Sequence, residues 1–109
     1  MTLMKLKGLS QWGTIDEIIV EDLPFTVGRH PDCMGQILHP LVSRQHCRFF
    51  MKDKQVWIED LDSVNGTTLN GMLVREPKPL NQGDVIGLPC NHFSIEEIAL
   101  DELEEVSVH

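Results

Sequence analysis

The sequence predicts an all-β fold, either a sandwich or a barrel. Residues that favour turns recur at short intervals along the 109-residue chain, and the short runs between them are rich in β-branched and aromatic residues. Many short strands separated by regular turn signals are typical of these two architectures. The turn signals are Gly8, Gly13, Pro24, 30–32, Gly35, Pro40, 53–54, 65–66, 70–71, Pro77, Pro79, 82–84 and Pro89.

The clearest strands form a predicted hairpin over residues 46–52 and 55–60, with a turn at 53–54. Apolar residues alternate with polar or amphipathic residues in both runs, as in strands with one face in a core. Cys47, which is one of these alternating residues, is therefore expected to be a small core residue. The other predicted strands are 4–7, 15–20, 25–28, 36–38, 68–69, 84–88 and 92–97.

The C-terminal stretch allows two interpretations. Ile95, Ile98, Leu103 and Val106 have the spacing of one helical face, and the many glutamates favour a helix. We instead predict a final strand that ends near Ile98. The domain would then comprise residues 1–98, and residues 99–109 would form an acidic tail or the start of a linker.

Length, charge and cysteine content restrict the class of protein. The length suits one domain, which we expect to be monomeric in isolation. No apolar run is long enough to span a bilayer, and a net charge of −8 disfavours nucleic acid and anionic membranes as partners. Three widely spaced cysteines argue against a disulfide framework. Together with the absence of a secretory-type N-terminus, they predict a cytoplasmic protein. These cysteines are Cys33, Cys47 and Cys90.

Small polar and basic residues concentrate in three loops, namely 28–30, 43–46 and 65–71. Loops of a β-sandwich gather at its two ends. If these three share one end, Arg29, Arg44 and several hydroxyl groups meet there. Guanidinium groups, hydroxyls and accessible backbone N–H groups are the donors that bind a tetrahedral oxyanion.

At these loops the sequence resembles the forkhead-associated (FHA) domain family. Four segments in family order carry the resemblance: Phe-Thr-Val-Gly-Arg at 25–29, Leu-Val-Ser-Arg-Gln-His at 41–46, Leu-Asp-Ser-Val-Asn-Gly-Thr-Thr-Leu-Asn-Gly at 61–71, and Leu-Asn-Gln-Gly-Asp-Val-Ile at 80–86. The resemblance implies a sandwich of two twisted, mainly antiparallel sheets with about eleven short strands and functional loops at one end. It also implies a signalling module that binds phosphothreonine segments of partner proteins.

The resemblance assigns a role to individual positions. Arg29 and Ser43 correspond to the phosphate-binding residues, and Arg44 to a frequent second phosphate contact. Asn65 corresponds to the residue that holds the partner's backbone, although Asn65-Gly66 is also a hairpin-turn signal. The positions that shape the loops are Gly28, His46, Gly66, Thr67 and Asn70.

Val64 departs from the family pattern, which usually has Ser or Thr before the asparagine. Valine has no side-chain donor for the phosphate, so we expect weaker binding than in a member with the full set. The departure also keeps an alternative open. The fold would then serve as a phosphate-independent interaction or packing module within a larger protein.

Two enzymatic interpretations are disfavoured. Ser43 and His46 have no nucleophile-elbow pattern around them. A metal site has only Cys90 and His92 at close ligand spacing. We therefore predict no catalysis, no metal and no cofactor. The acidic tail allows one further variant, in which residues 102–105 fold back onto the basic loops and compete with the ligand.

Overall fold

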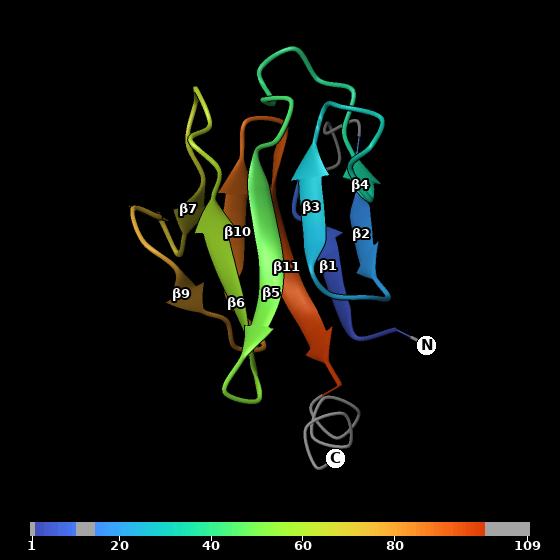
Figure 1. The fold of residues 1–109 in the computed structure, drawn as a ribbon, viewed down its shortest axis with the longest axis vertical. Helices are drawn as coiled ribbons and strands as arrows, with labels where there is room; N and C mark the ends of the chain where they lie inside the picture. Colours follow the sequence, from blue (N-terminus) through green and yellow to red (C-terminus); the bar gives the residue numbers. More distant parts are fainter. Residues whose placement is uncertain (1, 11–14, 100–109) are drawn as a thin grey trace.

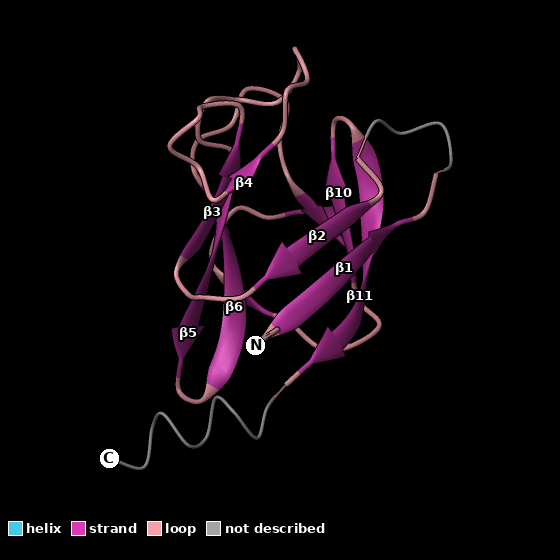
Figure 2. Cartoon of the chain, turned by 90° about the vertical axis from the view of Figure 1, so that its right-hand side faces the viewer, coloured by secondary structure: helices cyan, strands magenta, loops and turns pink. Residues whose placement is uncertain are grey.

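The computed structural model describes residues 2–10 and 15–99, which contain eleven strands and no helix. Two sheets face one another, as Figure 2 shows. The six-stranded sheet has the order β2-β1-β11-β10-β7-β8, and the five-stranded sheet has the order β4-β3-β5-β6-β9. The predicted all-β sandwich is therefore confirmed. The strands are β1 (Met4–Gly8), β2 (Glu17–Val20), β3 (Phe25–Gly28), β4 (Gly35–Gln36), β5 (Cys47–Lys52), β6 (Gln55–Asp60), β7 (Thr68–Leu69), β8 (Met72–Leu73), β9 (Lys78–Pro79), β10 (Val85–Leu88) and β11 (Asn91–Ile98).

Alternating apolar side chains of the two sheets form one core between them. In the β5–β6 hairpin, Phe49 and Ile58 pair across the strands, and both are buried. Their outward-facing neighbours are partly exposed, as expected for a strand with one face in the core. The turn between these strands places Asp53 and Lys54 in the left-handed region, at φ 52° and 61°. The predicted hairpin is thus confirmed, including its turn.

The shortest strands were not all predictable. The sequence gives no alternating pattern for β8 or β9, and neither was predicted. β4 comprises Gly35–Gln36 rather than 36–38, and it pairs with β3 in parallel. Leu38 lies outside it and is 78% exposed. A strand of two residues is too short to show a period of two, so only its tertiary partners define it.

The segment around Asn65-Gly66 is not a hairpin turn. β6 belongs to the five-stranded sheet and β7 to the six-stranded sheet, so the loop between them crosses from one layer to the other. The dipeptide that does close a hairpin is Asn70-Gly71, between β7 and β8. Its φ values are 51° and 86°, both in the left-handed region that such a turn requires.

The last described strand, β11, ends at Ile98, as predicted, and includes Ile95 as well. Its C-terminal end lies at the end of the sandwich opposite the loops that follow β3 and precede β5 (Figure 1). Leu103, Val106 and Gly13 lie outside the described residues, as do residues 100–109 of the predicted tail, so the boundary at residue 98 stays a prediction. Within the described ranges, no helix has the length and apolar character needed to cross a membrane.

Candidate functional site

The three polar loops meet at one end of the sandwich. The backbone N–H of Arg29 donates to the carbonyl of Ser43 at 2.9 Å. Directly before the third loop, the Val64 N–H donates to the Ser43 hydroxyl oxygen at 2.9 Å. The Asn65 side-chain amide donates to the carbonyl of Leu41 at 2.8 Å. Hydrogen bonds therefore connect the loops that carry Arg29, Ser43 and Asn65, so these residues share one rim.

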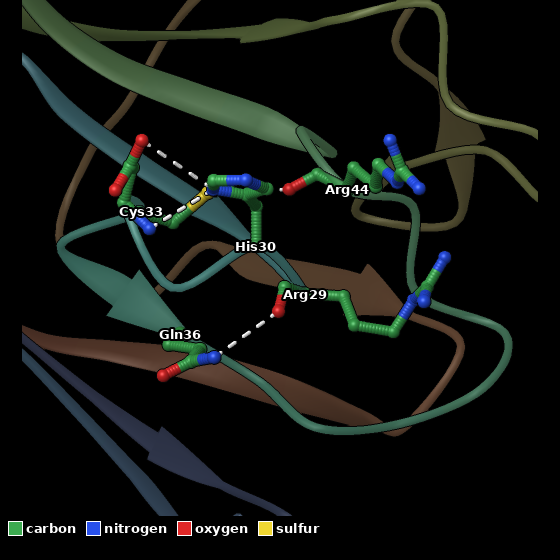
Figure 3. A network of polar contacts seen from close by, with 6 residues as sticks. Arg29, His30, Cys33, Gln36 and Arg44 are labelled. Atoms are coloured by element: carbon green, nitrogen blue, oxygen red, sulfur yellow. Dashed lines mark hydrogen bonds and ion pairs between the residues drawn. The ribbon is translucent and has the colours of Figure 1, made fainter.

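Two guanidinium groups border a hollow in this rim. Arg29 is exposed, and its Nε donates to the Val42 carbonyl at 3.0 Å, which fixes the base of the guanidinium and leaves its terminal N–H groups facing outward. Figure 3 shows the guanidinium groups of Arg29 and Arg44 extending to the same side. Together with His30 and Pro31 they line a hollow of about 290 Å³. Among the described residues, neither arginine forms an ion pair, so the hollow is electropositive.

The backbone of Arg44 is held close to strand β3. Its carbonyl accepts hydrogen bonds from the His30 N–H at 3.1 Å and from the Cys33 thiol at 3.2 Å. Burial raises the pKa of the Cys33 thiol, which therefore keeps the proton that it donates. A Cβ added at Gly28 would lie 2.1 Å from the same carbonyl oxygen. Only glycine fits here because the backbone of Arg44 passes so close.

We predict that Gly28→Ala lowers the free energy of unfolding by about 1–3 kcal/mol, the usual cost of overpacking. The backbone of Arg44 must move away from the new methyl group, so the shape of the electropositive hollow changes as well. Urea denaturation measures the first effect, and the amide chemical shifts of residues 29–44 report the second. Thr26→Ala, at an outward-facing position of the same strand, is the control. A denaturation midpoint equal to that of the unmodified chain contradicts the close approach.

His46 lies beneath the rim and connects the loop of Ser43 with the loop of Gly66. Its side chain is fully buried, with 0% exposure. Nδ1 accepts the backbone N–H of Ser43 at 3.1 Å, and Nε2 lies 2.9 Å from the carbonyl of Gly66. A backbone N–H can only donate and a carbonyl can only accept, so the ring is neutral with its proton on Nε2. The imidazole therefore engages the backbone of Ser43 rather than its hydroxyl, so His46 is not placed to act as a base for that hydroxyl.

Among the described residues, no group accepts a hydrogen bond from the Ser43 hydroxyl. Its oxygen accepts the Val64 N–H, so the O–H group remains able to donate to a ligand at the rim. The Val64 side chain is 87% exposed. At this position the chain thus contributes a backbone N–H to the support of Ser43 and an apolar side chain to the surface.

Asp60 organises the loop that carries Asn65. Its carboxylate accepts hydrogen bonds from the Ser63 N–H at 3.0 Å, from the Ser63 hydroxyl at 2.6 Å and from the Thr67 hydroxyl at 2.7 Å. The Ser63 oxygen in turn accepts the Gly66 N–H at 3.0 Å. Sequence reasoning placed Thr67 among the loop-shaping residues but missed Asp60 and Ser63. Their Asp-x-x-Ser spacing is a local signal, since such side chains commonly bond backbone groups two or three residues away.

Asn65 projects between two hollows. Its amide nitrogen bonds Leu41, so its Oδ1 atom remains available to accept a hydrogen bond from a ligand backbone. One neighbouring hollow, of about 270 Å³, contains Leu41 and Pro89. The other, of about 540 Å³, contains Val64 and Leu73.

Asn70 is not part of this rim. Its amide donates to Asp84 at 3.1 Å and its oxygen accepts the Val85 N–H at 2.8 Å. These bonds fasten the turn between β7 and β8 to the start of β10. Asn70 therefore shapes a hairpin of the six-stranded sheet and does not contact Arg29, Ser43 or Asn65.

The residues considered for a metal site are dispersed. In the part of the chain that the structure describes, no three His, Cys, Asp or Glu side chains are arranged to hold an ion. Cys33, Cys47 and Cys90 are free thiols, and burial raises the pKa of each.

The fold and this rim define a β-sandwich binding module with an electropositive hollow between its loops and the hydroxyl-bearing Ser43 next to Arg44 in the chain. The family profile of the FHA domain matches residues 25–89, and the chain belongs to that family. The resemblance found in the sequence is thus confirmed.

Relatives and solved structures agree with this assignment. Human proliferation marker protein Ki-67 is 34% identical over 73 residues, which cover 67% of this chain but 2% of that protein. The FHA domain-containing protein PS1 of Arabidopsis thaliana is 35% identical over 79 residues, which cover 68% of this chain and 5% of that protein. The chain therefore spans only a small part of the relatives that it matches.

Among solved structures, the FHA domain of the CT664 protein from Chlamydia trachomatis has a TM-score of 0.74 at 26% identity, covering 88% of this chain and 98% of that one. The MEK1 FHA domain in complex with a HOP1 phosphothreonine peptide has a TM-score of 0.69 at 26% identity, covering 91% of this chain and 99% of that one.

Proposed function

We propose that this chain is a phosphothreonine-dependent protein–protein interaction module that binds phosphorylated partner segments in signalling. The observation that supports the proposal is the pairing of Arg29 and Arg44 on one exposed hollow, with the Ser43 backbone bonded to that of Arg29 beside it. The similarity to the MEK1 FHA domain, which was solved with a phosphothreonine peptide, supports it.

In the proposed complex, the partner segment lies extended across the loop end. Its phosphate carries about −1.5 to −2 charges at neutral pH and enters the hollow between Arg29 and Arg44. The Ser43 hydroxyl donates to a phosphate oxygen, and Oδ1 of Asn65 accepts a backbone N–H of the partner. Because the loops are already joined by hydrogen bonds, little conformational entropy is lost when the partner binds.

Val64 bears on the strength of this interaction. Its side chain offers no donor to the phosphate, so the phosphate receives one hydrogen bond fewer than in a domain with Ser or Thr there. A hydrogen bond to a charged group contributes about 1.5–3 kcal/mol. The exposed apolar side chain is also the feature that favours the second candidate, a phosphate-independent interaction or packing module within a larger protein.

The proposal includes a setting for the module. We place it in the cytoplasm as a monomeric domain without catalytic activity, cofactor, nucleic-acid partner or membrane contact. The three free thiols and the net charge of −8 support this setting.

A titration with a degenerate phosphothreonine peptide library tests the proposed function. We expect binding to the phosphothreonine library, at least tenfold weaker binding to the phosphoserine library, and no saturable binding to the unphosphorylated one. The threonine preference would require a small apolar notch for the γ-methyl group. Equal affinity with and without phosphate would select the second candidate instead.

A further inference from the structure

A second surface adjoins the site on the Val64 side of Asn65. The hollow of about 540 Å³ next to Asn65 shares residues 73–76 with a hollow of about 720 Å³ that runs along the β7–β8 hairpin. We call the two together the lateral trough. Val64, Leu73 and Met72 line it, and they are 87%, 54% and 76% exposed, respectively.

The exposure of these side chains is unusual for the chain as a whole. Among the described residues, seven large hydrophobic side chains are exposed, and three of them line this trough. Single exposed apolar residues are common on protein surfaces, but a contiguous group next to a binding site marks an interaction surface. β8 is also an edge strand, and both of its residues are exposed.

The trough begins where the phosphate-binding rim ends. Leu73 Cδ2 lies 2.9 Å from the position that a Cβ of residue 66 would occupy, so this side chain packs directly on the backbone that follows Asn65. Gly66 has a φ of 85° and carries no side chain that would block this contact. The trough therefore lies directly beside the residue proposed to hold the partner's backbone.

Most charged groups of the trough already have partners. Glu59 pairs with Arg48 at 2.8 Å, and Glu76 pairs with Lys78 at 3.1 Å. Asp60 accepts the three hydrogen bonds described above. Asp62 and Arg75 also line the trough and carry opposite charges. The lining still has four acidic and two basic residues, so it disfavours an acidic ligand group, and its exposed apolar side chains favour an uncharged apolar one.

We propose that the lateral trough binds an apolar side chain of the same phosphorylated partner segment, on one flank of its phosphothreonine. This inference rests on the proposed function and adds a sequence preference to it. The continuity between Asn65 and the trough argues for the partner segment as the occupant. Three exposed side chains are too few for a stable interface with a second copy, which commonly buries about 800 Å² on each partner.

A peptide series with fixed phosphothreonine tests the proposal. Each position from four residues before it to four after it carries Leu, Ser or Glu in turn, and fluorescence anisotropy gives the affinity. We expect Leu to bind about fivefold to tenfold more tightly than Ser at one or two positions on a single flank. Met72→Ser and Leu73→Ser should each reduce that preference to less than about twofold, while the affinity for the Ser peptides stays the same.

Leu9→Ser is the matched control, since Leu9 is 60% exposed and lies outside the trough. It should retain the preference. The proposal is overturned if no flanking position prefers Leu, if Leu9→Ser removes the preference equally, or if Leu73→Ser removes it and Met72→Ser does not. Concentration-dependent dimerisation that Met72→Ser abolishes would assign the surface to a second copy and also overturn it. Binding that ignores phosphate contradicts the proposed function, whereas phosphate-dependent binding without a flank preference contradicts only the trough.

Discussion

Replacing Arg29 with alanine is expected to lower the affinity for a phosphothreonine peptide by at least about 30-fold, which corresponds to about 2 kcal/mol. The terminal N–H groups of this arginine face the hollow, and charge-assisted hydrogen bonds to phosphate are the strongest that the rim can offer. The substitution also removes the bond from Nε to the Val42 carbonyl. That bond is partly buried, so the free energy of unfolding should also fall, by about 1 kcal/mol.

Two further variants separate geometry from charge. Arg29→Lys keeps the positive charge but loses both the planar fork and the Nε bond, so we expect an intermediate affinity. Lys7→Ala removes one positive charge from an exposed position of β1, which is in the other sheet from β3, and should leave the affinity nearly unchanged. Isothermal titration calorimetry measures the affinity of Arg29→Ala and of these two variants. If Arg29→Ala and Lys7→Ala have the same affinity for the phosphopeptide, the phosphate does not bind at Arg29.

The length of each strand decides how much of the fold could be predicted. β3, β5 and β6 have at least four residues and a clear alternation, and their predicted bounds agree with the structure to within one residue. β8 and β9 have two residues each, so no pattern identifies them. The same short length explains why the strand predicted at 36–38 does not coincide with β4. Its pairing with β3 depends on a parallel partner that local sequence does not specify.

The site also has a part that could be predicted from the sequence and a part that could not. Arg29, Ser43 and Asn65 could be found because family motifs contain them, and their proximity follows from loops that share one end of a sandwich. The groups that hold these side chains in place mostly could not be predicted, because they are backbone groups. The Val42 carbonyl, the Val64 N–H and the Leu41 carbonyl hold the three side chains, and any residue type supplies such groups.

The second large effect is expected for His46→Phe, which should lower the free energy of unfolding by about 2–4 kcal/mol. Phenylalanine fills a similar volume, but it neither accepts the Ser43 N–H nor donates to the Gly66 carbonyl. Both backbone groups then lose their partners beneath the rim, and each unsatisfied buried group costs about 1–3 kcal/mol. Urea denaturation measures the total. His92→Phe, at an exposed histidine, is the control and should change stability by less than about 0.5 kcal/mol.

The effect of His46→Phe on binding follows from the same two bonds. A domain of this size commonly has about 5–15 kcal/mol of stability, so the variant remains folded and its affinity can be measured. Without the imidazole, the loops of Ser43 and Gly66 are no longer held at a fixed separation, and partner binding must order them. We expect the affinity for phosphopeptide to fall about tenfold, with faster hydrogen exchange at the Ser43 amide. If affinity falls while that amide stays protected, His46 does not act by joining the loops.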